Sequence, residues 1–368
     1  MAALGIKAAA VRGIFALPAP ARRLLAGPPV RIDGQELDLD AQLLIRLKNS
    51  SGSNVFADPV EGARARYDQL PRLIGYAPRT PVATREVGVP AEHGDIPATL
   101  YTPAGLPEPS GLLVYFHGGG FSVGSRISHD PVARYLAGHA GVRVLSVEYR
   151  RAPEHPFPAA VEDAIAAFDH AHRYAAELGA DPARIAVGGD SAGGNLAAVT
   201  AQQAVRRGGA VPAFQLLMYP PTDLGARRPS HHLFARASTF TDRNLRWALA
   251  NYVPAGVDPR DPRLSPLHGD VAGLPPAYLG SAGFDPIRDD GLAYADKLRA
   301  GGIPVALSRH GDLPHAYLNF VGLGGRFAEA AAEAAGALRL GLAMAKAGAS
   351  GTTAQGGAGE LVRVGDIP

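Results

Sequence analysis

Three features of the sequence predict an α/β fold, in which a mainly parallel sheet has helices on both faces. Short β-rich apolar runs alternate with helical stretches from residue 82 to residue 344. A glycine-rich turn with a central serine, residues 188–194, follows one of these runs and precedes a helix-like stretch. The chain has 368 residues, enough to bury one large core or two modest ones.

Eight strands are expected. A turn containing proline and glycine joins the first two, which predicts an antiparallel hairpin. Helices separate most of the later strands, and such alternation predicts right-handed crossovers between parallel strands. The serine turn comes after the fifth strand. The expected strands are 82–89, 96–101, 112–116, 142–147, 185–187, 214–218, 277–280 and 305–307, and the main helices between them are 130–138, 159–178, 194–206 and 289–300.

Two amphipathic helices are expected before the sheet. Leucines recur at positions 39, 43 and 47, and a second apolar stripe joins Val60, Ala63, Tyr67 and Leu70. We expect residues 1–80 to form a helical cap that encloses an apolar pocket.

The segment before these helices, residues 1–32, carries five basic residues and no acidic one. A basic arm of this kind lies either on a membrane surface or against its own protein. Prolines at 18, 20, 28 and 29 keep any helix here short, which favours a helix docked on its own protein.

The catalytic domain is expected to span residues 81–346. Between its sixth and seventh strands lies a long connection, 220–276, with a helical piece around Trp247. Connections of this length are usually functional, so residues 222–257 are expected to contribute to the cap. Residues 347–368 are rich in Gly, Ala, Ser and Thr, which predicts a disordered tail.

Composition excludes several classes of function. A formal net charge of +2 gives no electrostatic reason to expect a nucleic-acid partner. The absence of cysteine excludes disulfides, thiolate metal sites and a cysteine nucleophile, and no metal-ligand spacing occurs among the 12 histidines. No apolar run approaches the roughly 20 residues of a membrane span, and the first 18 residues do not resemble a signal peptide. We therefore expect a soluble, cytoplasmic protein without stable membrane insertion; the sequence leaves a homodimer open.

The serine turn fits a nucleophile elbow. In the pattern Gly189-x-Ser191-x-Gly193 the glycines give the strained turn room, and the serine hydroxyl is exposed at the edge of the sheet. The simpler alternative is a glycine-rich turn that opens a helix.

A second glycine run favours the elbow. Residues 117–120 read His-Gly-Gly-Gly directly after the third strand, where backbone N–H groups can approach an oxyanion. The N–H of Ala192 would supply the other half of the oxyanion hole.

A serine hydroxyl needs a histidine to accept its proton and a carboxylate to orient that histidine. Asp285 follows the seventh strand and His315 follows the eighth. Both lie at the carboxyl ends of strands, where such sites assemble. Four further residues compete for these roles: Asp289 and Asp290, which open a helix, Asp312, and His310, at the end of a strand.

Four ordered motifs resemble the hormone-sensitive-lipase-like esterases, over about residues 80 to 345. They are 117–121 (HGGGF), 149–158 (YRRAPEHPFP), 189–194 (GDSAGG) and 285–289 (DPIRD). The resemblance implies an α/β-hydrolase fold, an N-terminal cap and hydrolysis of carboxylic esters without a cofactor or metal.

Residue by residue, the resemblance implies Ser191 as nucleophile, with Asp285 and His315 as its partners. It implies Gly118, Gly119 and Ala192 as oxyanion donors, His117 as a support for the glycine loop and Glu154 as a brace for the elbow. Two positions depart from the pattern, because Arg151 replaces a leucine and Ala316 replaces the glycine that commonly follows the histidine.

The expected reaction is hydrolysis of a small ester with a short to medium acyl chain, through an acyl-enzyme. A non-catalytic receptor on the same fold is one alternative, although such receptors usually lack a member of the triad. An amide hydrolase or a lipase is another, because the same triad cleaves several acyl bonds.

Overall fold

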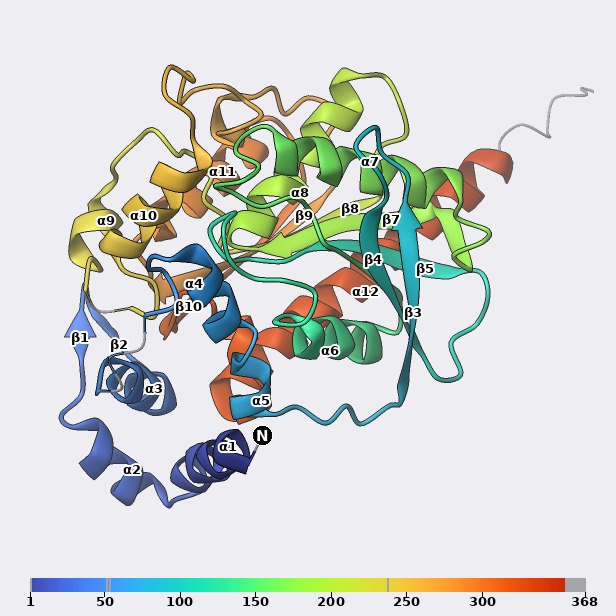
Figure 1. The fold of residues 1–368 in the computed structure, drawn as a ribbon. Coiled ribbons are helices and arrows are strands. Elements are labelled where there is room, and N and C mark those ends of the chain that lie inside the picture. The colour runs from blue at the N-terminus through green and yellow to red at the C-terminus, as the bar shows by residue number, and fades with distance from the viewer. Residues whose placement is uncertain (1, 51, 53, 237, 355–368) are drawn as a thin grey trace, which may run out of the picture.

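An eight-stranded sheet crosses the middle of the molecule (Figure 1). The computed structural model describes residues 2–50, 52, 54–236 and 238–354. All eight expected strands are present, which confirms the predicted sheet. They are β3 (Val82–Val89), β4 (Ile96–Pro103), β5 (Ser110–Phe116), β6 (Arg143–Val147), β7 (Ala180–Asp190), β8 (Phe214–Met218), β9 (Ala277–Phe284) and β10 (Val305–Pro314).

The strand order is β10-β9-β8-β7-β5-β6-β4-β3. β3 and β4 form the expected antiparallel hairpin, and β4 is antiparallel to β6. The other six strands, in the sheet order β6-β5-β7-β8-β9-β10, are parallel to one another. The chain passes from β5 to β6 on one side and then back to β7 on the other. In parallel sheets such a reversal of strand order leaves a crevice at the carboxyl ends, where ligands bind. The glycine run after β5 and the serine turn after β7 meet there.

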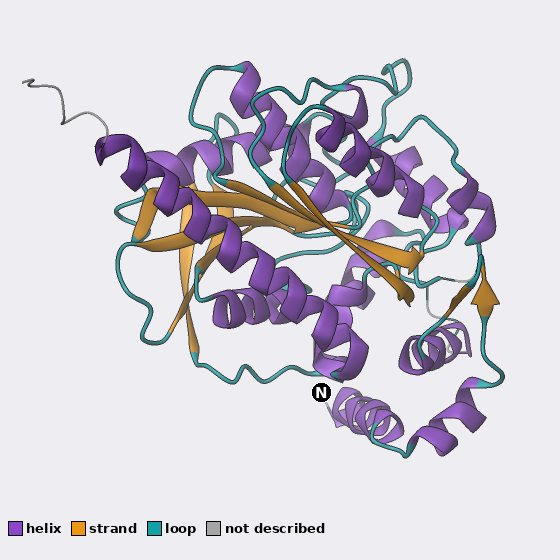
Figure 2. Ribbon diagram, turned by 180° about the vertical axis from the view of Figure 1, so that it is seen from behind, coloured by secondary structure: helices purple, strands orange, loops and turns teal. Residues whose placement is uncertain are grey.

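Helices cover both faces of the sheet, as Figure 2 shows from behind. Alternate strand residues point to opposite faces: Leu112 and Val114 pack in one buried cluster with α7, α8 and α11, whereas Leu113 and Tyr115 pack in another with α6 and α12. These helices are α6 (Asp130–Ala140), α7 (Ala159–Arg173), α8 (Ala192–Arg206), α11 (Arg288–Ala300) and α12 (Gly325–Ala354).

The last helix continues into the segment that was expected to be a disordered tail. α12 runs to Ala354, beyond the expected domain end at residue 346. The remainder of the expected tail, 355–368, lies outside the described residues. The long connection after β8 contains α9 (Pro229–Leu233), α10 (Asp242–Tyr252) and η1 (Pro266–His268), and η2 (Tyr317–Leu323) follows β10.

Among its described residues the N-terminal segment folds into five helices and a small hairpin, and the sequence did not predict the hairpin. Asp38 begins the third helix, because its side chain accepts hydrogen bonds from the N–H groups of Asp40 (2.9 Å) and Ala41 (3.1 Å). The first helix packs on the fifth, as expected for an arm that docks on its own protein. The elements are α1 (Ala2–Phe15), α2 (Ala19–Ala26), β1 (Arg31–Ile32), β2 (Gln35–Glu36), α3 (Leu39–Ser50), α4 (Val60–Tyr67) and α5 (Leu70–Ile74).

Within the described residues, no helix combines the length and the apolar character that crossing a membrane requires.

Candidate active site

Ser191 lies at a sharp turn between β7 and α8. Its backbone has φ 54° and ψ −119°, a conformation that side chains rarely adopt, and its N–H donates to the Met218 carbonyl oxygen (2.8 Å). Neither flanking position, 189 or 193, has room for a side chain. A Cβ at Gly189 would lie 2.3 Å from the carbonyl oxygen of Phe116, and a Cβ at Gly193 would lie 1.8 Å from the same oxygen. The spacing of the glycines thus follows from the close approach of β5.

Three side chains from different strand ends form one chain of hydrogen bonds. His315 Nε2 lies 2.9 Å from Ser191 Oγ, and His315 Nδ1 lies 2.6 Å from Asp285 Oδ2. The other Asp285 oxygen accepts the N–H of Ile287 (3.0 Å). Ser191 is 7% exposed, His315 3% and Asp285 0%. The arrangement can transfer a proton from the serine to the histidine while the carboxylate holds the imidazole.

The competing residues do not contact His315. Asp289 accepts the N–H of Ser230 (2.9 Å), and Asp290 lies 3.1 Å from Arg228. Asp312 pairs with Arg326 and His310 faces Glu333.

His315 is held from several sides. Thr239 Oγ1 donates a hydrogen bond to the His315 carbonyl oxygen, and the rings of Tyr219 and Phe240 lie 4.9 Å from the imidazole. Ala316, which follows, has φ 63°. This left-handed conformation explains why glycine is usual at this position, and it places Ala316 under local backbone strain.

The glycine loop after β5 differs from the expectation at Gly118. Its N–H donates to Asp190 Oδ1 (2.9 Å), so this donor is already engaged and does not face an incoming oxyanion. The backbone N–H groups of Gly119, Gly120 and Ala192 have no hydrogen-bond partner within the described residues. These three donors are therefore free to bind an oxyanion.

Asp190, the residue before the nucleophile, organises this loop and was not singled out in the sequence. It is almost fully buried and also accepts a hydrogen bond from Tyr115 (2.6 Å). Burial alone would raise the pKa of Asp190, but attraction to His129 and the hydrogen bonds from Tyr115 and Gly118 bring that pKa below its ordinary value. The buried Asp190 carboxylate thus fixes the glycine loop. The position of Asp190 inside the motif 189–194 is the one sequence feature that could have drawn attention to it.

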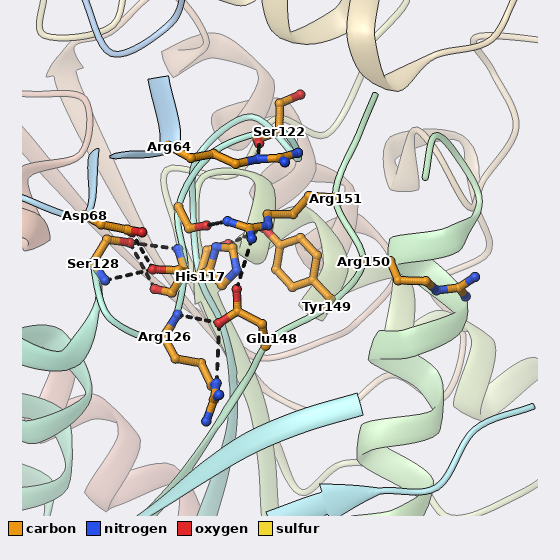
Figure 3. A network of polar contacts seen from close by, with 12 residues as sticks. Arg64, Asp68, His117, Ser122, Arg126, Ser128, Glu148, Tyr149, Arg150 and Arg151 are labelled. Carbon is orange, nitrogen blue, oxygen red and sulfur yellow. Dashed lines mark hydrogen bonds and ion pairs between the residues drawn. The ribbon is translucent and has the colours of Figure 1, made fainter. Parts of the chain in front are cut away.

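His117 lies behind the loop, in the network drawn in Figure 3. It is buried, stacks on Tyr149 with ring centroids 4.2 Å apart, and places Nδ1 2.8 Å from the Gly118 carbonyl oxygen. Burial and the proximity of His129 lower the pKa of His117 well below its ordinary value, which keeps the imidazole neutral. These contacts are consistent with a structural role for His117 in supporting the glycine loop. They give it no part in acid-base chemistry.

Arg151, the second departure from the family pattern, joins the same network. It donates to the Gly124 carbonyl oxygen and lies 3.4 Å from Glu148, whose other oxygen accepts the N–H of Arg126 (3.0 Å). The arginine therefore ties the end of the glycine loop to the segment after β6, which a leucine could not do.

Glu154 does not brace the elbow. Its carboxylate is 44% exposed and forms a two-pronged pair with Arg64 of α4 (2.6 and 2.8 Å). Hydrogen bonds from Arg64 lower the pKa of Glu154 to about 2. Arg64 also donates to the Ser122 and Ala152 carbonyl oxygens (2.9 Å each), so the pair attaches α4 to the catalytic domain.

A cavity of about 950 Å³ opens above Ser191 and His315. Its volume is near the upper end of the roughly 300–1,000 Å³ usual for ligand sites. Trp247 does not line it and instead packs on Phe56, 6.0 Å between centroids, and donates to Asp58 (3.0 Å). Most of the lining residues come from α1, α3, α4 and α5 and the loop before α4.

Comparison with known proteins agrees with this geometry. Residues 113–319 match the family model described as alpha/beta hydrolase fold. The carboxylic ester hydrolase LipN of Mycobacterium tuberculosis is 44% identical over 333 residues, covering 88% of each chain. The ethyl acetate hydrolase of Pseudomonas putida is 37% identical over 280 residues, 74% of this chain and 88% of that one.

Among solved structures, the ester hydrolase EH1AB1 from the metagenome of Lake Arreo, complexed with a derivative of bipyridine phosphonate, superposes with a TM-score of 0.80. It is 36% identical and covers 83% of this chain and 98% of its own. The fold and the site thus define an enzyme of the α/β-hydrolase superfamily. Within it, the chain belongs to the hormone-sensitive-lipase-like carboxylesterases and is a carboxylic ester hydrolase.

Proposed function

We propose that Ser191, His315 and Asp285 form the catalytic triad and cleave esters through an acyl-enzyme. The observation that carries this proposal is the continuous pair of hydrogen bonds, 2.9 Å and 2.6 Å, from Ser191 Oγ to the Asp285 carboxylate. A neutral imidazole so placed can act as a general base, and the carboxylate stabilises the cation that results.

In the first half of the reaction Ser191 Oγ attacks the ester carbonyl carbon and His315 Nε2 takes the serine proton. The C–O bond to the alcohol then breaks, and His315 returns the proton to the departing alkoxide. In the second half a water molecule gives its proton to His315 and attacks the acyl carbon. The acid leaves, and Ser191 Oγ recovers the proton.

The negative charge that develops on the carbonyl oxygen would be bound by backbone N–H groups. We assign these donors to Gly119 and Ala192, with Gly120 in place of Gly118, whose N–H binds Asp190. The N-terminal end of α8 adds favourable electrostatic potential at this point.

We further propose that residues 1–80, with 222–257, act as a cap over a catalytic domain of residues 81–346, and that the site accepts short to medium acyl chains. Apolar lining residues such as Leu44, Phe240 and Phe320 support an acyl site, and the cavity volume favours the medium lengths. The similarity to an ethyl acetate hydrolase supports short acyl chains.

A panel of p-nitrophenyl esters from acetate to laurate, beside a p-nitroanilide of a medium-chain acid, tests the proposal. We expect kcat/KM to peak at a short or medium chain and the anilide to be turned over far more slowly. Ser191→Ala should lose roughly 10⁴-fold or more of the ester activity. An anilide hydrolysed as fast as its ester would indicate an amide hydrolase, and an active Ser191→Ala variant would remove the nucleophile from the proposal.

A further inference from the structure

The cavity above Ser191 is rich in positive charge. Lys7, Lys48, Arg66 and Arg72 line it, one from each of four cap helices. The acidic residue in the lining is Asp190, and its carboxylate binds Gly118 and Tyr115 behind the site. Since the whole chain carries only +2, this concentration of cations is local.

Three of these cations, Lys7, Arg66 and Arg72, lie toward the solvent end of the cavity, whereas Lys48 bonds to Thr239 near its base. Ser191, His315 and Phe240 at its base are buried, whereas Lys7 and Arg72 are exposed and Arg66 is half-buried. An ester with its carbonyl at Ser191 would therefore extend its chain past apolar walls toward positively charged side chains.

Several carboxylates of the N-terminal segment are engaged elsewhere. Two cap acids pair with arginines outside the cavity: Asp40 with Arg22 and Glu36 with Arg31. Asp33 pairs with Arg288 of the catalytic domain, and Asp68 accepts a hydrogen bond from Ser125.

By contrast, three of the cavity cations have no ion-pair partner among the described residues: Lys7, Arg66 and Arg72. Arg66 donates from Nε to the Asn54 carbonyl oxygen (2.9 Å), a contact that leaves its charge uncompensated. Uncompensated cations at the mouth of an apolar cavity are complementary to a ligand that is apolar at one end and anionic at the other.

We propose that the enzyme prefers esters whose acyl chain ends in an anionic group, such as a terminal carboxylate, which Lys7, Arg66 and Arg72 bind at the mouth of the cavity. This inference rests on the proposed acyl-enzyme, with the acyl chain lying in the cavity above Ser191. The cations would act on substrate binding and leave the chemistry at Ser191 unchanged.

The test compares two series of p-nitrophenyl esters, from four to twelve carbons in the acyl chain. One series ends in a methyl group and the other in a carboxylate. We expect the ratio of kcat/KM, carboxylate-ended over methyl-ended, to lie below one for the shortest chains, whose charge would enter the apolar base. The ratio should rise above one as the chain reaches the mouth, and it should fall again at high salt, because exposed charges are screened.

Variants locate the effect. Arg72→Gln, Arg66→Gln and Lys7→Gln should each lower the ratio at the preferred length roughly two- to fivefold, mainly through KM. Arg79→Gln is the matched control, since Arg79 is exposed and close in sequence to α5 but does not line the cavity. That variant should leave the ratio unchanged.

The result that overturns the inference is a ratio at or below one for every chain length, or an equal loss in the Arg79→Gln control. Hydrolysis of the methyl-ended esters separates the two proposals. If these neutral esters are cleaved and the ratio stays flat, the anion site is absent and the acyl-enzyme proposal survives. If neither series is cleaved, the acyl-enzyme proposal itself has failed.

Discussion

Ser191 is held in a backbone conformation that costs on the order of 1–3 kcal/mol. The turn is maintained by its N–H bond to Met218, by the bond from Asn195 N–H to the Ser191 carbonyl oxygen (3.0 Å), and by glycines on either side. The strain has a consequence for catalysis, because this conformation directs the hydroxyl toward His315 at the crevice between β5 and β7.

The acid proposed for the triad, Asp285, can be tested against its nearest competitor. Asp285→Asn should lower kcat by as much as about 10⁴-fold, the loss that the equivalent change causes in trypsin, because the histidine then takes the wrong tautomer. Asp289→Asn should change kcat by less than about tenfold, since Asp289 binds Ser230 and Arg288 and does not touch the histidine. Steady-state kinetics on one medium-chain ester measures both. Comparable losses in the two variants would show that Asp285 is not the acid.

The sequence predicted the positions of Ser191, Asp285 and His315 because each follows a recognisable strand, and parallel strands end at one edge. It could not predict the direction of the Gly118 N–H, because that direction depends on Asp190, buried beneath the loop. The error at Glu154 has a similar origin. Its partner Arg64 lies 90 residues earlier in the chain, and no local pattern links the two.

Among the elements, α3 joins the N-terminal segment to the loop that holds the histidine. Lys48 near its end donates to the Thr239 carbonyl oxygen, and the Thr239 hydroxyl donates to the His315 carbonyl oxygen. Burial lowers the pKa of Lys48 from its usual 10.5 to about 8. The helix therefore carries a cation whose charge is disfavoured in the folded state.

This burial predicts a pH dependence of stability. Between pH 8 and 10.5 the unfolded chain retains a proton on Lys48 that the folded chain releases, so this lysine makes stability rise with pH across that window. The Lys48→Met variant has no titratable group at this position, so it should lack this rise in stability. Urea denaturation gives the free energy of unfolding of the parent and of the variant. The difference, parent minus variant, should rise by about 1–3 kcal/mol from pH 7.5 to pH 10.

Arg46→Met, on the same helix, is the control for this measurement, because its exposed guanidinium does not titrate in that range. The difference between the parent and the control should stay constant. A Lys48 difference that is flat or falls with pH would mean that the lysine is not buried as described.

The N-terminal segment shares its hydrophobic core with the rest of the molecule. Leu37, Ala41 and Ile74 pack in the cluster that contains α6 and α12, and Phe56 and Tyr67 pack with residues before and within α10. The eight strands were predictable because each carries its own apolar pattern. The position of the N-terminal segment was not predictable, because an amphipathic stripe shows that a helix face is covered without showing which element covers it.

One part of this segment is attached more lightly. Of the described side chains of α1, only Ala8 is buried, while Val11 and Phe15 line the cavity. Deleting residues 1–17 should therefore change the melting temperature by only a few degrees and kcat/KM for the acetate ester by less than about twofold. kcat/KM for the octanoate ester should fall by roughly fivefold or more, because the chain loses an apolar wall. Unchanged octanoate kinetics would show that α1 does not enclose the acyl chain.

Ser191 is the proposed nucleophile of this serine ester hydrolase, and it can be trapped chemically. A p-nitrophenyl alkylphosphonate phosphonylates an activated serine: the serine oxygen bonds to phosphorus and p-nitrophenolate leaves. The reaction stops there, so it records the nucleophile directly. Peptide mass spectrometry of the treated enzyme should find one phosphonyl group per chain, on Ser191, with p-nitrophenol released in equal amount and esterase activity lost in parallel. His315→Ala should label far more slowly. Modification of a different serine, or full activity in a protein whose Ser191 is labelled, would show that Ser191 is not the nucleophile.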